Sequence, residues 1–172
     1  MKKHTGMRPH DVAVLLKILS KEKNKETWLM KDLSIELFLS GSEISESLNR
    51  SVIAKLVAED KKTVMKMSLI DFLAFGLPYV YPQKPGALVR GIDTAHSAEP
   101  ISDEISFSEH FVWAHSEGEV RGQEISPLYP KLPEACLKDA YFYQLMALCD
   151  VLRVGKMRER KMAIQLLKER LC

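Results

Sequence analysis

Residues 28–45 read WLMKDLSIELFLSGSEIS, and this stretch decides the fold of the N-terminal part of the chain. Its apolar residues recur at helical spacing on both sides of Ser40-Gly41, which predicts two helices joined by a tight turn. Ser40 and Glu43 form an S-x-x-E capping box, a signature of a helix N-terminus. The side chains expected to make the contact between the helices are Leu33, Leu37, Ile44 and Leu48. The stretch is therefore predicted to be a helix-turn-helix.

The flanking sequence extends this motif. Pro9 suits the first position of a preceding helix, and residues 21–26 contain no apolar residue, which predicts a solvated loop. Thr27 is expected to cap the second helix, with Trp28 and Leu29 on its buried side. The third helix is expected to reach Ala58. Residues 60–67 have no glycine turn and no second strand, so we expect either a stunted wing or a direct linker.

The remainder of the chain alternates in character. Ser68 is expected to cap a fourth helix, and residues 79–82 are expected to be extended. The tripeptide Val-Arg-Gly occurs at residues 89–91 and 120–122, in a region rich in proline and glycine, which predicts two paired β segments. Asp139 is expected to cap a long helix in the tail.

These patterns predict a mainly α (α+β) fold in three parts. Residues 7–67 form a winged-helix-like helix-turn-helix domain. Residues 68–131 form a linker helix and a segment with short β strands, and residues 132–172 form a helical tail.

Composition and charge narrow the class of protein. Hydrophobic residues make up 46% of the 172 residues and charged residues 28%, which is ordinary for a globular protein. No apolar run approaches the roughly 20 residues that span a bilayer, so no membrane partner is expected. The three cysteines form no C-x-x-C pair, which favours a reduced, cytoplasmic protein.

The charge is divided unevenly along the chain. Residues 1–67 carry 13 basic and 9 acidic residues, a net charge of +4. Residues 68–152 carry −7 and residues 153–172 carry +5. Basic ends of this kind attract polyanions, and they also occur as solvated helix faces.

Few patterns point to catalysis or metal binding. The sequence contains no G-x-S-x-G, no P-loop and no G-x-G-x-x-G. His110 and His115 are five residues apart, a spacing that suits shared metal ligation on neither a helix nor a strand. We therefore expect no metal, no cofactor and no enzymatic activity. An enzyme centred on His96 and Arg90 is a third and weaker hypothesis.

Arg90 and Arg121 stand out, because they and Lys84 are the only lysines and arginines in the acidic residues 68–130, and each arginine sits in a Val-Arg-Gly tripeptide. Two interpretations are open. Each arginine could form an ion pair with a nearby carboxylate, such as Asp93, Glu119 or Glu124, and so stabilise the fold. Alternatively, Arg90, His96 and Arg121 could line a pocket for an anion or another ligand.

Residues 28–45 resemble the helix-turn-helix of bacterial MarR-type regulators, which have Leu-x-Leu-Ser at the turn and Ser-x-Ile-Ser in the reading helix. The whole chain resembles small bacterial MarR-like proteins of unassigned function, notably at residues 89–97 and 118–122. The resemblance implies a homodimer on a palindromic site in double-stranded DNA. It implies that the residues facing bases are Ser42, Ser45, Glu46 and Asn49. It implies that the residues holding phosphates are Lys31, Arg50 and Lys55.

The sequence thus favours a sequence-specific DNA-binding transcriptional regulator. The alternative is a protein–protein interaction module, such as an antitoxin or an adaptor for a product of the same operon. The acidic middle of the chain and Glu46, a carboxylate on the reading helix, favour this alternative.

Overall fold

The structure is a computed structural model that describes residues 6–172. Within these residues the chain is mainly α-helical, with a small three-stranded sheet in the middle and a helical C-terminal part, as the sequence predicts. The elements are α1 (Pro9–Lys23), α2 (Met30–Leu37), α3 (Gly41–Ile53), α4 (Lys66–Phe75), α5 (Leu77–Val80), β1 (Leu88–Thr94), β2 (Phe111–Ala114), β3 (Val120–Glu124), α6 (Leu132–Leu137), α7 (Ala140–Val154) and α8 (Met157–Leu171).

Helix α1 lies at the centre of the N-terminal half and packs against α2, α3 and α7. Every residue from 11 to 21 is buried, including two lysines. The ammonium group of Lys17 lies 2.7 Å from a carboxylate oxygen of Asp139, and that of Lys21 lies 2.7 Å from Glu36. The prediction of a loop over residues 21–26 is therefore wrong in its first half, because these ion pairs allow the charged end of α1 to continue as helix.

The predicted helix-turn-helix is present in α2 and α3. Leu33, Leu37 and Ile44 are fully buried and Leu48 is 2% exposed. The capping box is confirmed, because the Ser40 amide donates to Glu43 Oε2 at 2.8 Å and the Glu43 amide donates to Ser40 Oγ at 3.2 Å.

The predicted ends of these helices need correction. Helix α2 begins at Met30, where the Asp32 carboxylate accepts the Leu29 amide proton at 2.7 Å, so Thr27 is not the cap. The Leu29 side chain is 67% exposed, not buried. Helix α3 ends at Ile53 and not at Ala58, because Lys55 adopts a left-handed backbone conformation with φ of 60°.

A stunted wing follows α3, one of the two predicted outcomes. Val57 and Val64 form a single antiparallel bridge. The turn between them is held by Asp60, whose carboxylate accepts hydrogen bonds from the amides of Lys62 and Thr63 and from the Thr63 hydroxyl, at 2.6–2.9 Å. A turn closed by an aspartate in this way needs no glycine.

Two predictions for the next segment are wrong. Helix α4 begins at Lys66, before the expected cap Ser68. Helix α5 covers residues 77–80, so the prediction of an extended segment over residues 79–82 is wrong in its first half. Pro78 lies in the first turn of α5. Backbone amides in the first turn have no acceptor within the helix, so the missing amide of proline costs no hydrogen bond there.

The Val-Arg-Gly segments pair as predicted. Strands β1 and β3 are antiparallel, with Val89 opposite Gly122 and Arg90 opposite Arg121. Strand β2 pairs with β1 on its other side and closes onto β3 in a parallel register, so the three strands form a small closed barrel. A Cβ atom on Gly91 would lie 2.0 Å from the Trp113 carbonyl oxygen, so only glycine allows this close strand approach.

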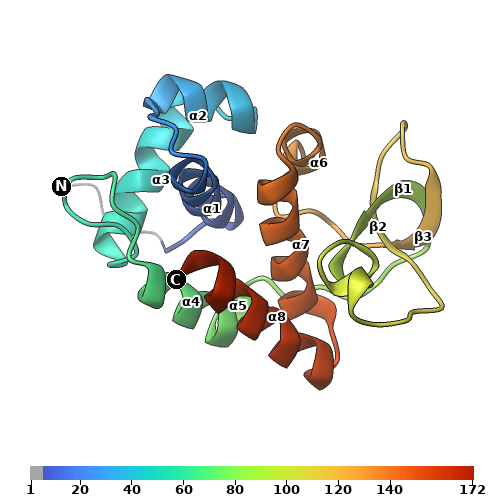
Figure 1. The fold of residues 1–172 in the computed structure, drawn as a ribbon. Coiled ribbons are helices and arrows are strands. Elements are labelled where there is room, and N and C mark those ends of the chain that lie inside the picture. The colour runs from blue at the N-terminus through green and yellow to red at the C-terminus, as the bar shows by residue number, and fades with distance from the viewer. Residues whose placement is uncertain (1–5) are drawn as a thin grey trace.

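Figure 1 shows the helix-turn-helix and the sheet at opposite sides of the molecule, with α6 and α7 between them. Asp139 caps α7 as predicted, accepting the Phe142 amide proton at 3.0 Å. One hydrophobic core contains residues from all three predicted parts, such as Leu15, Leu73 and Leu148. None of the helices in residues 6–172 is long and apolar enough to cross a membrane.

Candidate nucleic-acid interface

Helix α3 presents one polar face to solvent. Ser42 and Asn49 are exposed, and Ser45 and Glu46 between them are half-buried. The spacing of these four residues places them along one side of the helix, opposite the buried Ile44 and Leu48. The predicted base-facing residues therefore lie together on one accessible surface.

Exposed lysines lie at the two ends of the helix-turn-helix motif and in the wing. Lys31, in the first turn of α2, and Lys55, directly after α3, are both exposed as predicted. The wing adds Lys61 and Lys62, which are exposed in the turn closed by Asp60. Hydrogen bonds from the Thr63 hydroxyl and from the Thr63 and Lys62 amides lower the pKa of Asp60 to about 2, so the turn keeps its carboxylate acceptor at neutral pH.

Sequence reasoning missed Lys61 and Lys62 as candidate contacts. The signal that could have found them is the Asp60-x-x-Thr63 spacing, which is typical of a turn closed by an aspartate side chain. Recognising that turn would have placed the two lysines at the tip of a wing.

Arg50 does not lie on the predicted outward face. Its side chain is buried, and Nε and Nη2 donate to the two carboxylate oxygens of Asp11 at 2.9 and 2.7 Å. This bidentate pair joins α3 to α1. The prediction that Arg50 holds a phosphate is corrected on this ground, because its guanidinium is committed to Asp11 inside the protein.

The two glutamates of α3 have different surroundings. The Glu43 carboxylate caps the helix, and the hydrogen bond from the Ser40 amide lowers its pKa. Glu46 has a carboxylate oxygen 3.8 Å from Arg50 Nη1. Because buried Arg50 lies close to Glu46, part of the negative charge on the exposed face of α3 is balanced from within the protein.

A comparison of this chain with known protein families, curated proteins and solved structures finds no match.

The outer surface of the helix-turn-helix also carries apolar side chains, all close to α2. Four large hydrophobic residues here are 41–67% exposed: Leu29, Met30, Ile35 and Phe38. The Lys138 ammonium group lies 4.7 Å from the centre of the Phe38 ring, which brings the end of α6 to the same surface. Large exposed apolar side chains around one helix make α2 a candidate contact surface for another molecule.

The predicted ligand pocket of Arg90, His96 and Arg121 is not a single site. Arg90 and Arg121 are opposite each other and exposed. His96 is only 8% exposed and lies in the short helical turn that follows β1. The end of β1, Thr94, is itself about 13 Å along the strand from Arg90 by the ordinary rise per residue. Its ring packs on Phe107 and Phe111, and Nε2 contacts the Glu109 carbonyl oxygen at 2.8 Å.

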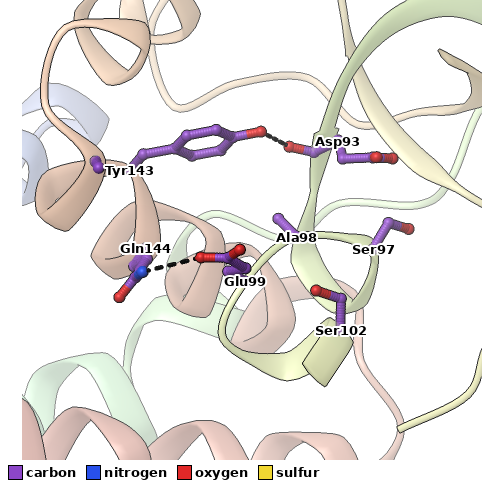
Figure 2. A pocket seen from close by; sticks show the side chains of 8 residues that line it. Asp93, Ser97, Ala98, Glu99, Ser102, Tyr143 and Gln144 are labelled. Atoms are coloured by element: carbon purple, nitrogen blue, oxygen red, sulfur yellow. Dashed lines mark hydrogen bonds between the residues drawn. The ribbon is translucent and has the colours of Figure 1, made fainter. Parts of the chain in front are cut away.

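A hollow of about 400 Å³ lies between the segment after β1 and the start of α7 (Figure 2). The Tyr143 hydroxyl donates to the Asp93 carbonyl oxygen across one side of it, and the Gln144 amide lies 3.3 Å from Glu99 Oε2 (Figure 2). These polar groups bond to one another. Within residues 6–172 no three His, Cys, Asp or Glu side chains are grouped to hold a metal ion.

Proposed function

We propose that this protein is a sequence-specific DNA-binding regulator that acts as a homodimer. The observation that carries the proposal is the polar face of α3, with Ser42, Ser45 and Asn49 accessible, between exposed lysines of α2 and of the wing. Short polar side chains on a reading helix can approach base edges in the major groove, and flanking cations can hold the backbone. The resemblance of residues 28–45 to MarR-type regulators supports the same function.

The side chains divide into two roles under this proposal. Asn49 can make a bidentate contact with adenine, and Glu46 can accept a hydrogen bond from the cytosine amino group. The cations that contact phosphates are Lys31, Lys55, Lys61 and Lys62. A second copy of the chain would place a second α3 on the other half of a palindromic site. The Asp11–Arg50 pair holds α3 at a fixed angle to α1, which suits a helix that must enter a groove in one orientation.

The test is an electrophoretic mobility shift with a fragment of the protein's own promoter at low salt, where the phosphate contribution is greatest. Replacing Asn49 by alanine is expected to weaken specific binding by roughly 1–3 kcal/mol and to relax preference at one base pair. Changing both Lys61 and Lys62 to glutamine is expected to weaken binding to all sequences and to reduce the slope of log K against log salt by about 2.

Lys84→Gln is the matched control, because Lys84 is an exposed lysine in the segment before β1, outside the helix-turn-helix. It should leave binding unchanged. Absence of any shift at low salt with the unaltered protein would contradict the proposal.

A second candidate function is the docking of a protein partner encoded in the same operon, and the exposed apolar side chains around α2 favour it. Ile35 is 62% exposed in the middle of this surface. Co-purification from cells that carry the native operon is expected to recover a stoichiometric partner. Ile35→Glu should abolish its recovery, whereas Asn49→Ala should not. A protein that elutes with no partner when unaltered would argue against this function.

A further inference from the structure

Arg90 and Arg121 occupy directly opposite positions on β1 and β3. Opposite residues of an antiparallel pair share one face of the sheet, with Cβ atoms about 4.5–5.5 Å apart. Both side chains are exposed. Two like charges at this separation repel each other and destabilise the strand pair, so this position on the sheet favours an additional negative group.

The residues that the structure describes do not supply that group. Asp93, the nearest of the expected partners along β1, bonds to His110 Nδ1 at 2.7 Å instead. Among residues 6–172 neither arginine forms an ion pair, and Glu119 and Glu124 contact neither guanidinium. The interpretation in which carboxylates of the sheet neutralise the two arginines is therefore wrong.

The pair is held in place by the backbone around it. Arg90 Nε donates to the Gly118 carbonyl oxygen, which orients its guanidinium and leaves the two terminal nitrogens without a hydrogen-bonding partner in the described part of the chain. The strands themselves form a closed barrel that is tied to α7 through the hydrogen bond from the Thr94 hydroxyl to Asp150. A site on rigid elements of this kind loses little freedom when it binds a ligand.

We propose that Arg90 and Arg121 form a binding site for a phosphate group. Arginine presents its N–H donors in a planar fork that matches two oxygens of a phosphate, and two such forks can hold a dianion between them. The dianion would also remove the repulsion between the two guanidinium groups. The sheet and the helix-turn-helix lie at opposite sides of the molecule (Figure 1), so the site does not depend on DNA binding by α3.

The direct test is a titration with inorganic phosphate at constant ionic strength, with chloride as the reference anion, followed by calorimetry and by the melting temperature. A saturable phosphate-specific rise in melting temperature is expected, because a ligand that binds only the folded state stabilises it. Arg121→Gln is expected to weaken phosphate binding about tenfold or more, the usual effect of losing charged hydrogen bonds. Arg121→Lys keeps the positive charge but lacks the planar fork of N–H donors. Its phosphate affinity should lie between those of the unaltered protein and of the Arg121→Gln variant.

Arg121 makes no side-chain hydrogen bond within the described residues, so its replacement should not unfold the protein, and without phosphate the glutamine variant should melt no lower than the unaltered chain. Arg158→Gln, a change at an exposed arginine of α8, is the control with the same loss of charge and should bind phosphate normally. Equal responses to phosphate and chloride, or equal phosphate affinity in the Arg121→Gln and Arg158→Gln variants, would overturn the proposal.

A phosphate group can come from a nucleic-acid backbone or from a small phosphorylated compound. Duplex DNA titrated into the unaltered protein and into the Arg121→Gln variant distinguishes these sources. A loss of duplex affinity in the variant would assign the phosphate to a nucleic acid, and unchanged duplex affinity beside weakened inorganic phosphate binding would assign it to a small compound. A chain that binds phosphate but no duplex would contradict the function proposed for α3 and leave the sheet site intact.

Discussion

Replacing Asp11 by alanine is expected to lower the free energy of unfolding by about 3–5 kcal/mol, the usual effect of removing one partner from a buried ion pair. The Asp11 side chain is fully buried and accepts from two nitrogens of Arg50, at 2.9 and 2.7 Å, and from the Arg8 amide at 2.8 Å. Without the carboxylate, the Arg50 guanidinium stays in the interior of the α1–α3 interface with no anionic partner of comparable geometry. Urea unfolding followed by circular dichroism measures the change.

The control for this prediction is the double variant Asp11→Leu with Arg50→Met, which removes both charges and keeps the volume filled. Replacing a buried ion pair by apolar side chains of similar size is often neutral or stabilising, so the double variant should recover most of the lost stability. If the alanine variant unfolded at the same urea concentration as the unaltered protein, the buried pair would have no structural role.

Asp150→Ala is expected to have an effect of similar size, about 3–5 kcal/mol. Asp150 is 1% exposed and accepts from the Thr94 hydroxyl, the Trp113 indole nitrogen and Arg153 Nη1, each at 2.8 Å. These donors come from β1, β2 and α7, so a single carboxylate joins the sheet to the helices. Its removal deprives the Thr94 hydroxyl and the Trp113 indole nitrogen of this acceptor and leaves Arg153 with only the carbonyl oxygens of Tyr81 and Ser126. The fluorescence of Trp113 should report the loosening of the sheet during urea unfolding.

Two further variants keep this prediction specific. Thr94→Val removes one of the three hydrogen bonds and is expected to cost about 1 kcal/mol. Asp71→Ala changes an exposed aspartate of α4 and should leave stability almost unchanged. A loss in the Asp150→Ala variant no larger than that in Asp71→Ala would show that the sheet is held by packing alone.

The parts of the fold that the sequence predicts are those set by local chemistry. The capping box at Ser40 and Glu43 and the cap at Asp139 depend on residues three positions apart, so both were predicted correctly. The paired Val-Arg-Gly segments were predicted from their composition and repetition. The end of α1 was missed because the buried Lys21 ammonium is paired with Glu36, 15 residues further along the chain, as well as with Glu26 in the following loop.

The candidate site follows the same division. The outward positions of Ser42 and Asn49 follow from the helical period of Ile44 and Leu48, which the sequence displays. Arg50 was misplaced because its orientation depends on Asp11, 39 residues earlier. An isolated α3 would expose Arg50 to solvent, and only the opposing carboxylate of α1 makes the buried position favourable.

The enclosure of α1 has a consequence for the order in which the protein is made. Lys17 on α1 bonds to Asp139, 122 residues later, and α7 covers a side of α1 that α2 and α3 leave open. The helix-turn-helix is therefore synthesised well before α7, the helix that packs against the remaining side of α1. Until α7 emerges, α1 exposes apolar surface, and Lys17 has Glu36 but not Asp139 as a carboxylate partner. Complete burial of α1 therefore has to wait until α7 has been synthesised and has packed against it.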